Sequence, residues 1–180
     1  MAARTVLQQA DIARSLTRIA HEIIESDHGS DLVLLGIPTR GVLLANRLGV
    51  ILDELAPGST QVGALDVTMY RDDLAKQPTR TPSPTSVPRG GIDGTTVILV
   101  DDVLYSGRTI RAALDAINDL GRPRAVRLAV LIDRGHRDLP IRADFVGKNL
   151  PTSQSQRIYV KLLETDGQDL VAIYDEEDHG

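Results

Sequence analysis

Two adjacent carboxylates, Asp101 and Asp102, stand in the middle of the stretch 97–109. The four apolar residues before them are typical of a strand buried on both faces, so we expect the acids where this strand ends. A short polar loop around Gly107 follows, and a helical pattern begins directly after it. Carboxylates accept hydrogen bonds from sugar hydroxyls, while a glycine loop and the first amides of a helix bind anions. The stretch therefore predicts a ribose-phosphate site past the carboxyl end of a strand.

The alternative interpretation of this stretch is an ordinary strand, turn and helix in which one Asp caps the helix. A helix cap needs a single acid, whereas two acids and a glycine loop occur together here. We therefore favour the ligand site over the cap.

Two further polar turns, at residues 36–41 and 133–137, follow other predicted strands. In the first turn, the guanidinium of Arg40 can donate two hydrogen bonds to a phosphate, although an ordinary turn explains its glycines equally well. The carboxyl ends of parallel strands meet at one edge of a sheet, so the three turns should converge on one cleft. This layout suits a pyrophosphate, a ribose 5-phosphate and a base.

The elements that must hold these turns alternate between strands and helices. Apolar residues at helical spacing predict helices over 8–25, about 42–55 and 110–120. Short apolar runs predict strands at 32–36, 61–70, 97–100, 126–132, 145–147, 157–163 and 170–174. The last two strands should form a hairpin-like pair. We expect an α/β fold with a mostly parallel central sheet flanked by helices.

The longest loop of the chain covers residues 77–91, which hold four of the nine prolines. Loops of more than about 12–15 residues are usually functional lids or disordered linkers. We interpret about 71–95 as a flexible flap within a single domain that spans residues 1–180, with a passive insertion as the alternative. Arg71 and Arg80 are candidates to reach a phosphate when the flap closes.

Composition narrows the possible classes of protein. The chain has 180 residues, enough for one well-buried domain, and no cysteine, which excludes disulfides and zinc–thiolate sites. A net charge of −5 argues against a generally basic nucleic-acid-binding protein, although residues 122–148 carry a local excess of basic side chains. No membrane-spanning run and no signal-peptide core are present, so we expect a cytoplasmic protein without a membrane partner.

The stretch 97–109 resembles the signature of type I phosphoribosyltransferases, which bind phosphoribosyl pyrophosphate. The resemblance implies that the acids hold the ribose 2- and 3-hydroxyls and that the loop holds the 5-phosphate. It implies Asp101, Asp102 and Arg40 as catalytic residues. It also implies Mg²⁺ as a cofactor, bound mainly through phosphoribosyl pyrophosphate and not at a metal site of the protein. The expected substrate-binding residues are Thr39, Arg40, Gly41, Arg71, Asp101, Asp102, Val103, Leu104, Tyr105, Ser106, Gly107, Arg108, Thr109, Asp133 and Arg134.

Five stretches, all of them outside that signature, are similar to the bifunctional bacterial pyrimidine operon regulators that also have uracil phosphoribosyltransferase activity. They are residues 16–22, 36–41, 70–74, 133–137 and 139–149. The resemblance implies conversion of uracil and phosphoribosyl pyrophosphate to UMP and pyrophosphate. It also implies UMP-promoted binding to a pyrimidine operon mRNA leader, and assembly as a homodimer or homotetramer.

By the same resemblance, the RNA-binding residues would be Thr17, Arg18, His21, Arg137, Arg142 and Lys148. The cations suit phosphates, while the Thr and His side chains suit loop bases or 2-hydroxyls. Only 3% of the residues are aromatic, so RNA recognition would depend on hydrogen bonds and charge. Two alternatives remain: a uracil or purine transferase that binds no RNA, and a non-enzymatic regulator that senses UMP.

Overall fold

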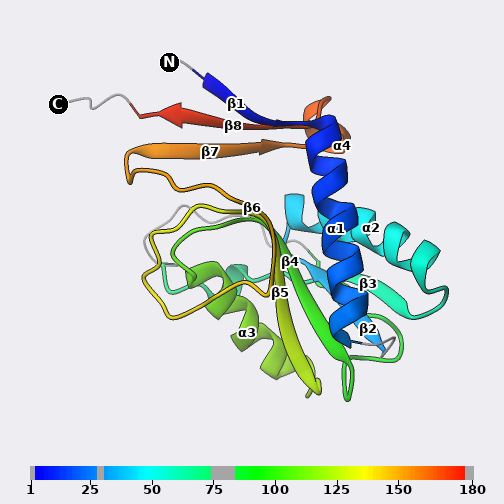
Figure 1. The fold of residues 1–180 in the computed structure, drawn as a ribbon. Coiled ribbons are helices and arrows are strands. Elements are labelled where there is room, and N and C mark those ends of the chain that lie inside the picture. Colours follow the sequence, from blue (N-terminus) through cyan, green and yellow to red (C-terminus); the bar gives the residue numbers. More distant parts are fainter. Residues whose placement is uncertain (1–2, 28–30, 74–83, 177–180) are drawn as a thin grey trace.

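The computed structural model describes residues 3–27, 31–73 and 84–176 of the chain. A parallel sheet with helices on both faces forms the body, and a small antiparallel sheet lies above it (Figure 1). Residues 74–83, with Arg80 and part of the expected flap, lie outside the described residues.

The central sheet has five parallel strands in the order β3-β2-β4-β5-β6. They are β2 (Leu32–Gly36), β3 (Thr60–Ala64), β4 (Thr96–Leu104), β5 (Ala125–Asp133) and β6 (Phe145–Asn149). This arrangement confirms the expected α/β fold with a mostly parallel sheet. The carboxyl ends of β2, β4 and β5 therefore share one edge, as the three polar turns require.

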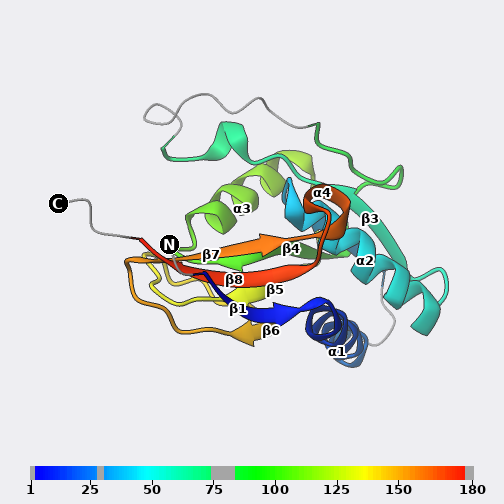
Figure 2. The ribbon, with the colours of Figure 1, turned by 90° about the horizontal axis from the view of Figure 1, so that it is seen from above.

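Three helices cover the two faces of this sheet: α1 (Gln9–Asp27), α2 (Arg40–Leu55) and α3 (Arg108–Leu120). Successive side chains of a strand point to opposite faces, so β4 contributes Ile98 to the core under α1 and α2 and Leu99 to the core under α3. Figure 2 shows α1 and α3 on opposite sides of the sheet. None of the helices within the described ranges is long and apolar enough to cross a membrane.

The small sheet, which we call the hood, has the strand order β1-β8-β7 and antiparallel pairing. Its elements are β1 (Ala3–Gln8), β7 (Gln156–Lys161), the short helix α4 (Leu163–Asp166) and β8 (Leu170–Asp175). The expected pairing of the last two strands is confirmed, whereas β1 is absent from the sequence-based expectations. Arg47 of α2 ties the hood to the body because it ion-pairs with Glu164 at 2.6 Å and with Asp169 at 2.8 Å.

The strand expected over 61–70 is wrong in its second half, because β3 ends at Ala64. The amide of Thr68 and its hydroxyl both donate to Oδ1 of Asp66, at 3.1 and 2.7 Å, and these bonds turn the chain. A short 3₁₀ helix, η1 (Thr68–Tyr70), follows. The turn leaves Asp66 and Thr68 at the carboxyl edge of the sheet, where they line a cavity.

The end expected for the signature strand also differs, because β4 continues through both acids to Leu104. Asp101 pairs with Val130 of β5, and Leu104 pairs with Asp133. The acids are therefore held in a sheet ladder and not in the loop beyond it. Pairing with β5 fixes their backbone positions, which suits residues that must orient a ligand.

Candidate functional site

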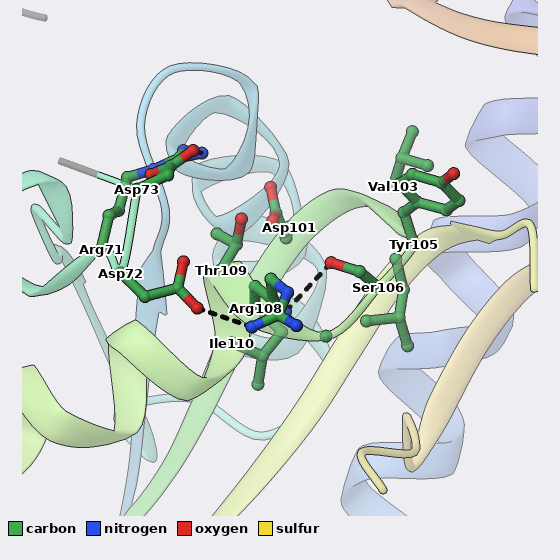
Figure 3. A pocket seen from close by; sticks show the side chains of 12 residues that line it. Arg71, Asp72, Asp73, Asp101, Val103, Tyr105, Ser106, Arg108, Thr109 and Ile110 are labelled. Atoms are coloured by element: carbon green, nitrogen blue, oxygen red, sulfur yellow. Dashed lines mark hydrogen bonds and ion pairs between the residues drawn. The ribbon is translucent and has the colours of Figure 1, made fainter. Parts of the chain in front are cut away.

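Most of the expected substrate residues gather around two adjoining cavities at the carboxyl edge of the central sheet, whereas Asp133 and Arg134 do not line either one. The larger cavity, of about 540 Å³, lies between the turn at 36–41 and β4. The smaller one, of about 250 Å³, lies over the loop at 105–109 (Figure 3). Asp101 and Arg71 line both, so the two cavities form one continuous site.

The acid pair supplies the most unusual electrostatics of the site. Oδ1 of Asp101 accepts the backbone amide of Asp102 at 2.9 Å, and Oδ1 of Asp102 accepts the amide of Val103 at 2.8 Å. Burial raises the pKa of the Asp101 carboxyl well above its ordinary value, and the adjacent charge of Asp102 raises it further. Such a crowded pair is stabilised by hydroxyl groups that donate to it, as the vicinal hydroxyls of a ribose can.

The loop after β4 has the geometry of an anion site. Gly107 has a φ of +92°, a left-handed conformation that residues with a side chain rarely adopt. Helix α3 begins at the next residue. The hydroxyl of Ser106 accepts the amide of Arg108 at 3.3 Å, and Thr109 stands in the first turn of α3. Helix amides, two hydroxyls and an adjacent cavity suit a phosphate monoester.

Arg108 joins this loop to two neighbouring segments. One of its Nη atoms lies 2.7 Å from Asp72, and its Nε lies 3.3 Å from Asp138. Figure 3 shows the contact with Asp72 at the start of the expected flap. The side chain of Arg108 therefore links the loop to both segments.

The turn after β2 packs directly against β4. The amide of Ile37 donates to the carbonyl of Val100 at 2.9 Å. Any Cβ at Gly41 would overlap the same carbonyl oxygen and lie 3.3 Å from the Cα of Asp101. The turn contains a cis peptide bond between Pro38 and Thr39. Only glycine permits this approach, which brings the expected pyrophosphate turn next to the acid pair.

Arg40 stands on the wall of the larger cavity, but its guanidinium is bound by the hood. Its Nη2 lies 2.9 Å from Oδ1 of Asp166, and its Nε lies 3.3 Å from Oδ2. Arg71, which also lines this cavity, donates to Asp73 at 2.9 and 3.1 Å. Both expected phosphate-binding arginines thus reach the site while paired with carboxylates.

The third turn lines a separate open cavity of about 510 Å³ together with residues 149–152. Its Arg134 is only 7% exposed and donates to the carbonyls of Ser153 and Gln156 at 3.2 and 2.7 Å. The guanidinium also lies 4.2 Å from the centre of the Tyr105 ring. Arg134 therefore holds the wall of this cavity together, while Asp133 lies at its rim.

The expected RNA-binding residues lie mainly on α1 and around β6. Thr17, Arg18 and His21 are exposed on one side of α1. Arg18 donates to the carbonyls of Val146 and Gly147 in β6, at 3.1 and 2.6 Å. Arg18 and Lys148 line one shallow hollow on the surface. Arg142, six residues before Lys148 in the sequence, is exposed as well.

Arg137 differs from the other five residues of that set. Its side chain is 21% exposed, and it donates to Asp133 at 2.6 Å, to the Tyr105 carbonyl at 2.7 Å and to the Ile141 carbonyl at 2.9 Å. The side chain of Arg18 is 49% exposed, and Arg142 and Lys148 are exposed residues, whereas Arg137 is directed into the fold.

Several site residues were not expected from the sequence. Asp66 and Thr68 line the larger cavity, and their Asp-x-Thr spacing is a turn signal that could have placed them there. Asp72, Asp138 and Asp166 hold site arginines, but their spacing in the sequence gives no sign of this role.

Comparison with known proteins agrees with this geometry. Residues 3–164 match the family model described as the phosphoribosyl transferase domain. The chain is 68% identical to the bifunctional protein PyrR of Leifsonia xyli over 96% of this chain and 97% of that protein. It is 63% identical to the protein of the same name from Streptomyces coelicolor, over 95% and 89%.

Solved structures with the same fold include purine-specific transferases. A hypoxanthine-guanine phosphoribosyltransferase from Bacillus anthracis superposes with a TM-score of 0.72 at 17% identity, over 95% of this chain and 98% of that one. A hypoxanthine phosphoribosyltransferase from Staphylococcus aureus gives 0.69 at 17% identity, over 93% and 90%. At this identity the likeness concerns the fold, so the base specificity has to be argued from the chain itself.

Proposed function

Because the chain belongs to the family of bifunctional PyrR proteins, which are built on the phosphoribosyl transferase domain, we propose two linked activities for it. It transfers the phosphoribosyl group from phosphoribosyl pyrophosphate to uracil, which gives UMP and pyrophosphate. It also binds the leader of a pyrimidine operon mRNA when UMP is bound, and so regulates pyrimidine biosynthesis. The substrates of the transferase reaction and the mRNA leader occur in the bacterial cytoplasm, where we propose that the chain acts.

One observation supports the transferase activity most directly. The acid pair of β4 stands between a phosphate loop and a turn that carries Arg40, across one continuous cavity. A molecule with a 5-phosphate at one end, a pyrophosphate at the other and a ribose between them matches this order. The acids then accept the ribose hydroxyls, and residues 106–109 hold the 5-phosphate.

In the proposed reaction, the bond between C1 of the ribose and the pyrophosphate oxygen breaks, and its electron pair leaves with the pyrophosphate. A ring nitrogen of uracil then bonds to C1 and loses its proton. The chain needs no covalent nucleophile for this substitution. It must hold the base near C1, neutralise the leaving group with Arg40 and Arg71, and exclude water. We assign the base to the turn at 133–137, which lines its own cavity in this structure.

The oxygen-rich wall of the larger cavity suits Mg²⁺, because Asp66, Asp101 and Asp102 all line it. Among the described residues, no three His, Cys, Asp or Glu side chains form a metal cluster. We therefore propose that Mg²⁺ arrives with phosphoribosyl pyrophosphate and that Asp101 and Asp102 help to hold it. When bound, it would withdraw negative charge from the leaving pyrophosphate.

The transferase activity is tested by following UMP formation from uracil, phosphoribosyl pyrophosphate and Mg²⁺. We expect turnover with uracil and none with hypoxanthine or guanine under the same conditions. Turnover with purines only would contradict the base assignment. Absence of turnover with every base, in a sample that still binds UMP, would instead favour a regulator without enzyme activity.

For RNA, we propose that Thr17, Arg18, His21, Arg142 and Lys148 contact the leader directly, on the side of the molecule formed by α1 and β6. Arg137 belongs to the same set by resemblance, and its inward hydrogen bonds give it a supporting role. We also propose a homodimer or homotetramer, which measurement of the molar mass in solution tests.

Replacing Arg142 by Gln should weaken binding of the leader RNA about tenfold, because one charge-assisted contact is worth about 1.5 kcal/mol or more. The salt dependence should also fall, since the variant releases fewer counterions. Titration of labelled RNA at several salt concentrations measures both effects. Arg122→Gln, an exposed substitution between α3 and β5 at the opposite end of the sheet, serves as the matched control. Equal losses in both variants would contradict the assignment of Arg142.

A further inference from the structure

We call residues 105–109, which follow β4, the phosphate loop. Residues 138–142, which we call the backing segment, lie against this loop. The amides of Asp138 and Leu139 both donate to the carbonyl of Ser106, at 2.9 and 3.2 Å. A Cβ placed on Gly107 would lie only 3.3 Å from Cβ of Ile141. The phosphate loop and the backing segment are therefore packed and hydrogen-bonded as one unit, and Arg142 stands at the end of that unit.

Arg137 fastens this unit at three points. Its Nη1 donates to the carbonyl of Tyr105, its Nε to the carbonyl of Ile141, and its Nη2 to the carboxylate of Asp133. These acceptors belong to the phosphate loop, the backing segment and the end of β5. A single planar guanidinium thus sets the relative position of three segments.

The geometry of a peptide unit links these contacts to the ligand. In a trans peptide the carbonyl and the following amide point in opposite directions. The Tyr105 and Ser106 carbonyls face Arg137 and the backing segment, so the amides of Ser106 and Gly107 face the other way. A phosphate that accepts those amides polarises the same peptide units and strengthens the hydrogen bonds on their far side.

We propose that Arg137 is a positioning residue through which a bound 5-phosphate fixes the backing segment and hence Arg142 for RNA. The inference rests on the proposed function and adds the route by which the site regulates RNA binding. The ligand class follows from the geometry: a ribose 5-phosphate such as UMP acts on the loop. Uridine, which lacks the phosphate, does not.

Arg137 is distinguished from a direct RNA contact by comparing two substitutions, Arg137→Lys and Arg137→Met. Lysine keeps the charge but cannot bridge three diverging acceptors. A residue that only meets an RNA phosphate would therefore be largely rescued by lysine. A bridging residue would be lost in both variants.

The experiment measures RNA affinity with UMP, with uridine and with neither, alongside amide hydrogen exchange at residues 138 and 139. In the wild-type chain, UMP should raise the affinity and slow the exchange, whereas uridine should do neither. In both Arg137 variants, the ratio of the affinities with and without UMP should fall to about one, the value for uncoupled sites. Arg122→Met, the matched control, should keep the wild-type ratio.

Two results would overturn the inference: a normal UMP effect in Arg137→Lys, or amide exchange at 138 and 139 that UMP leaves unchanged in the wild-type chain. The exchange measurement needs no RNA. If the wild-type chain binds no leader RNA, the proposed regulatory function fails, while exchange at these two amides still decides whether the phosphate loop controls the backing segment.

Discussion

Replacing Asp102 by Asn is expected to lower the turnover number about 10²–10³-fold, the usual cost of losing one group that stabilises charge in a transition state. The amide has nearly the shape of the carboxylate and can still accept the backbone amide of Val103. It has no negative charge to orient the ribose hydroxyls or to stabilise positive charge at C1. Steady-state kinetics with uracil and phosphoribosyl pyrophosphate measure the loss.

The stability of the same variant provides its control. Asp101 has a pKa raised by burial and by the charge of Asp102, so it destabilises the fold as the pH rises through that raised pKa. Removing the charge of Asp102 lowers the pKa of Asp101 and reduces this loss. We therefore expect Asp102→Asn to be at least as stable as the wild-type chain at neutral pH in denaturant titrations. A variant that is both inactive and unstable would not support the ribose role.

Replacing Gly41 by Ala is expected to lower the free energy of unfolding by about 3 kcal/mol, the upper part of the usual range for overpacking. The added methyl group would overlap the carbonyl of Val100, whose backbone is held in the β2–β4 ladder. The pyrophosphate turn would shift away from β4, so the KM for phosphoribosyl pyrophosphate should rise as well. Chemical denaturation and initial-rate kinetics measure the two effects.

Gly90→Ala is the matched control for that substitution, because a Cβ at Gly90 meets open space. Its residue type and added volume are the same, and only the surroundings differ. A Gly-to-Ala change at an unstrained, open site stabilises a protein by about 0.4–1 kcal/mol through the unfolded state. If both alanine variants behave alike, the close approach of Gly41 to β4 is not important for stability.

The body of the fold is predictable because its signals are local. The apolar runs at 32–36 and 126–132 indicate strands buried on both faces, whatever their partners. The hood is different, since β1 exposes most of its side chains and exists through pairing with β8 at the other end of the chain. The early end of β3 depends on one Asx turn at Asp66, a short signal within an alternating pattern.

In the candidate site, too, the features that depend on local sequence are predictable, and those that depend on distant segments are not. The acid pair and Gly107 are recognisable because their neighbours in sequence are also their neighbours in space. Spacing does not tell whether an arginine points outward or inward, since this depends on carbonyls and carboxylates supplied by distant segments. Arg137 is therefore expected at the RNA surface from the sequence, whereas its hydrogen bonds lie within the fold.

The pairing of β1 with β8 has a consequence for the order in which the parts of the protein fold during synthesis. The first described strand leaves the ribosome long before its partner, and the partners of Arg40 and Arg47 in the hood also come from the last part of the chain. The central sheet, whose strands follow one another closely, can assemble during translation. The hood closes over the carboxyl edge only afterwards, so a nascent chain carries an assembled phosphate loop before it carries a finished site.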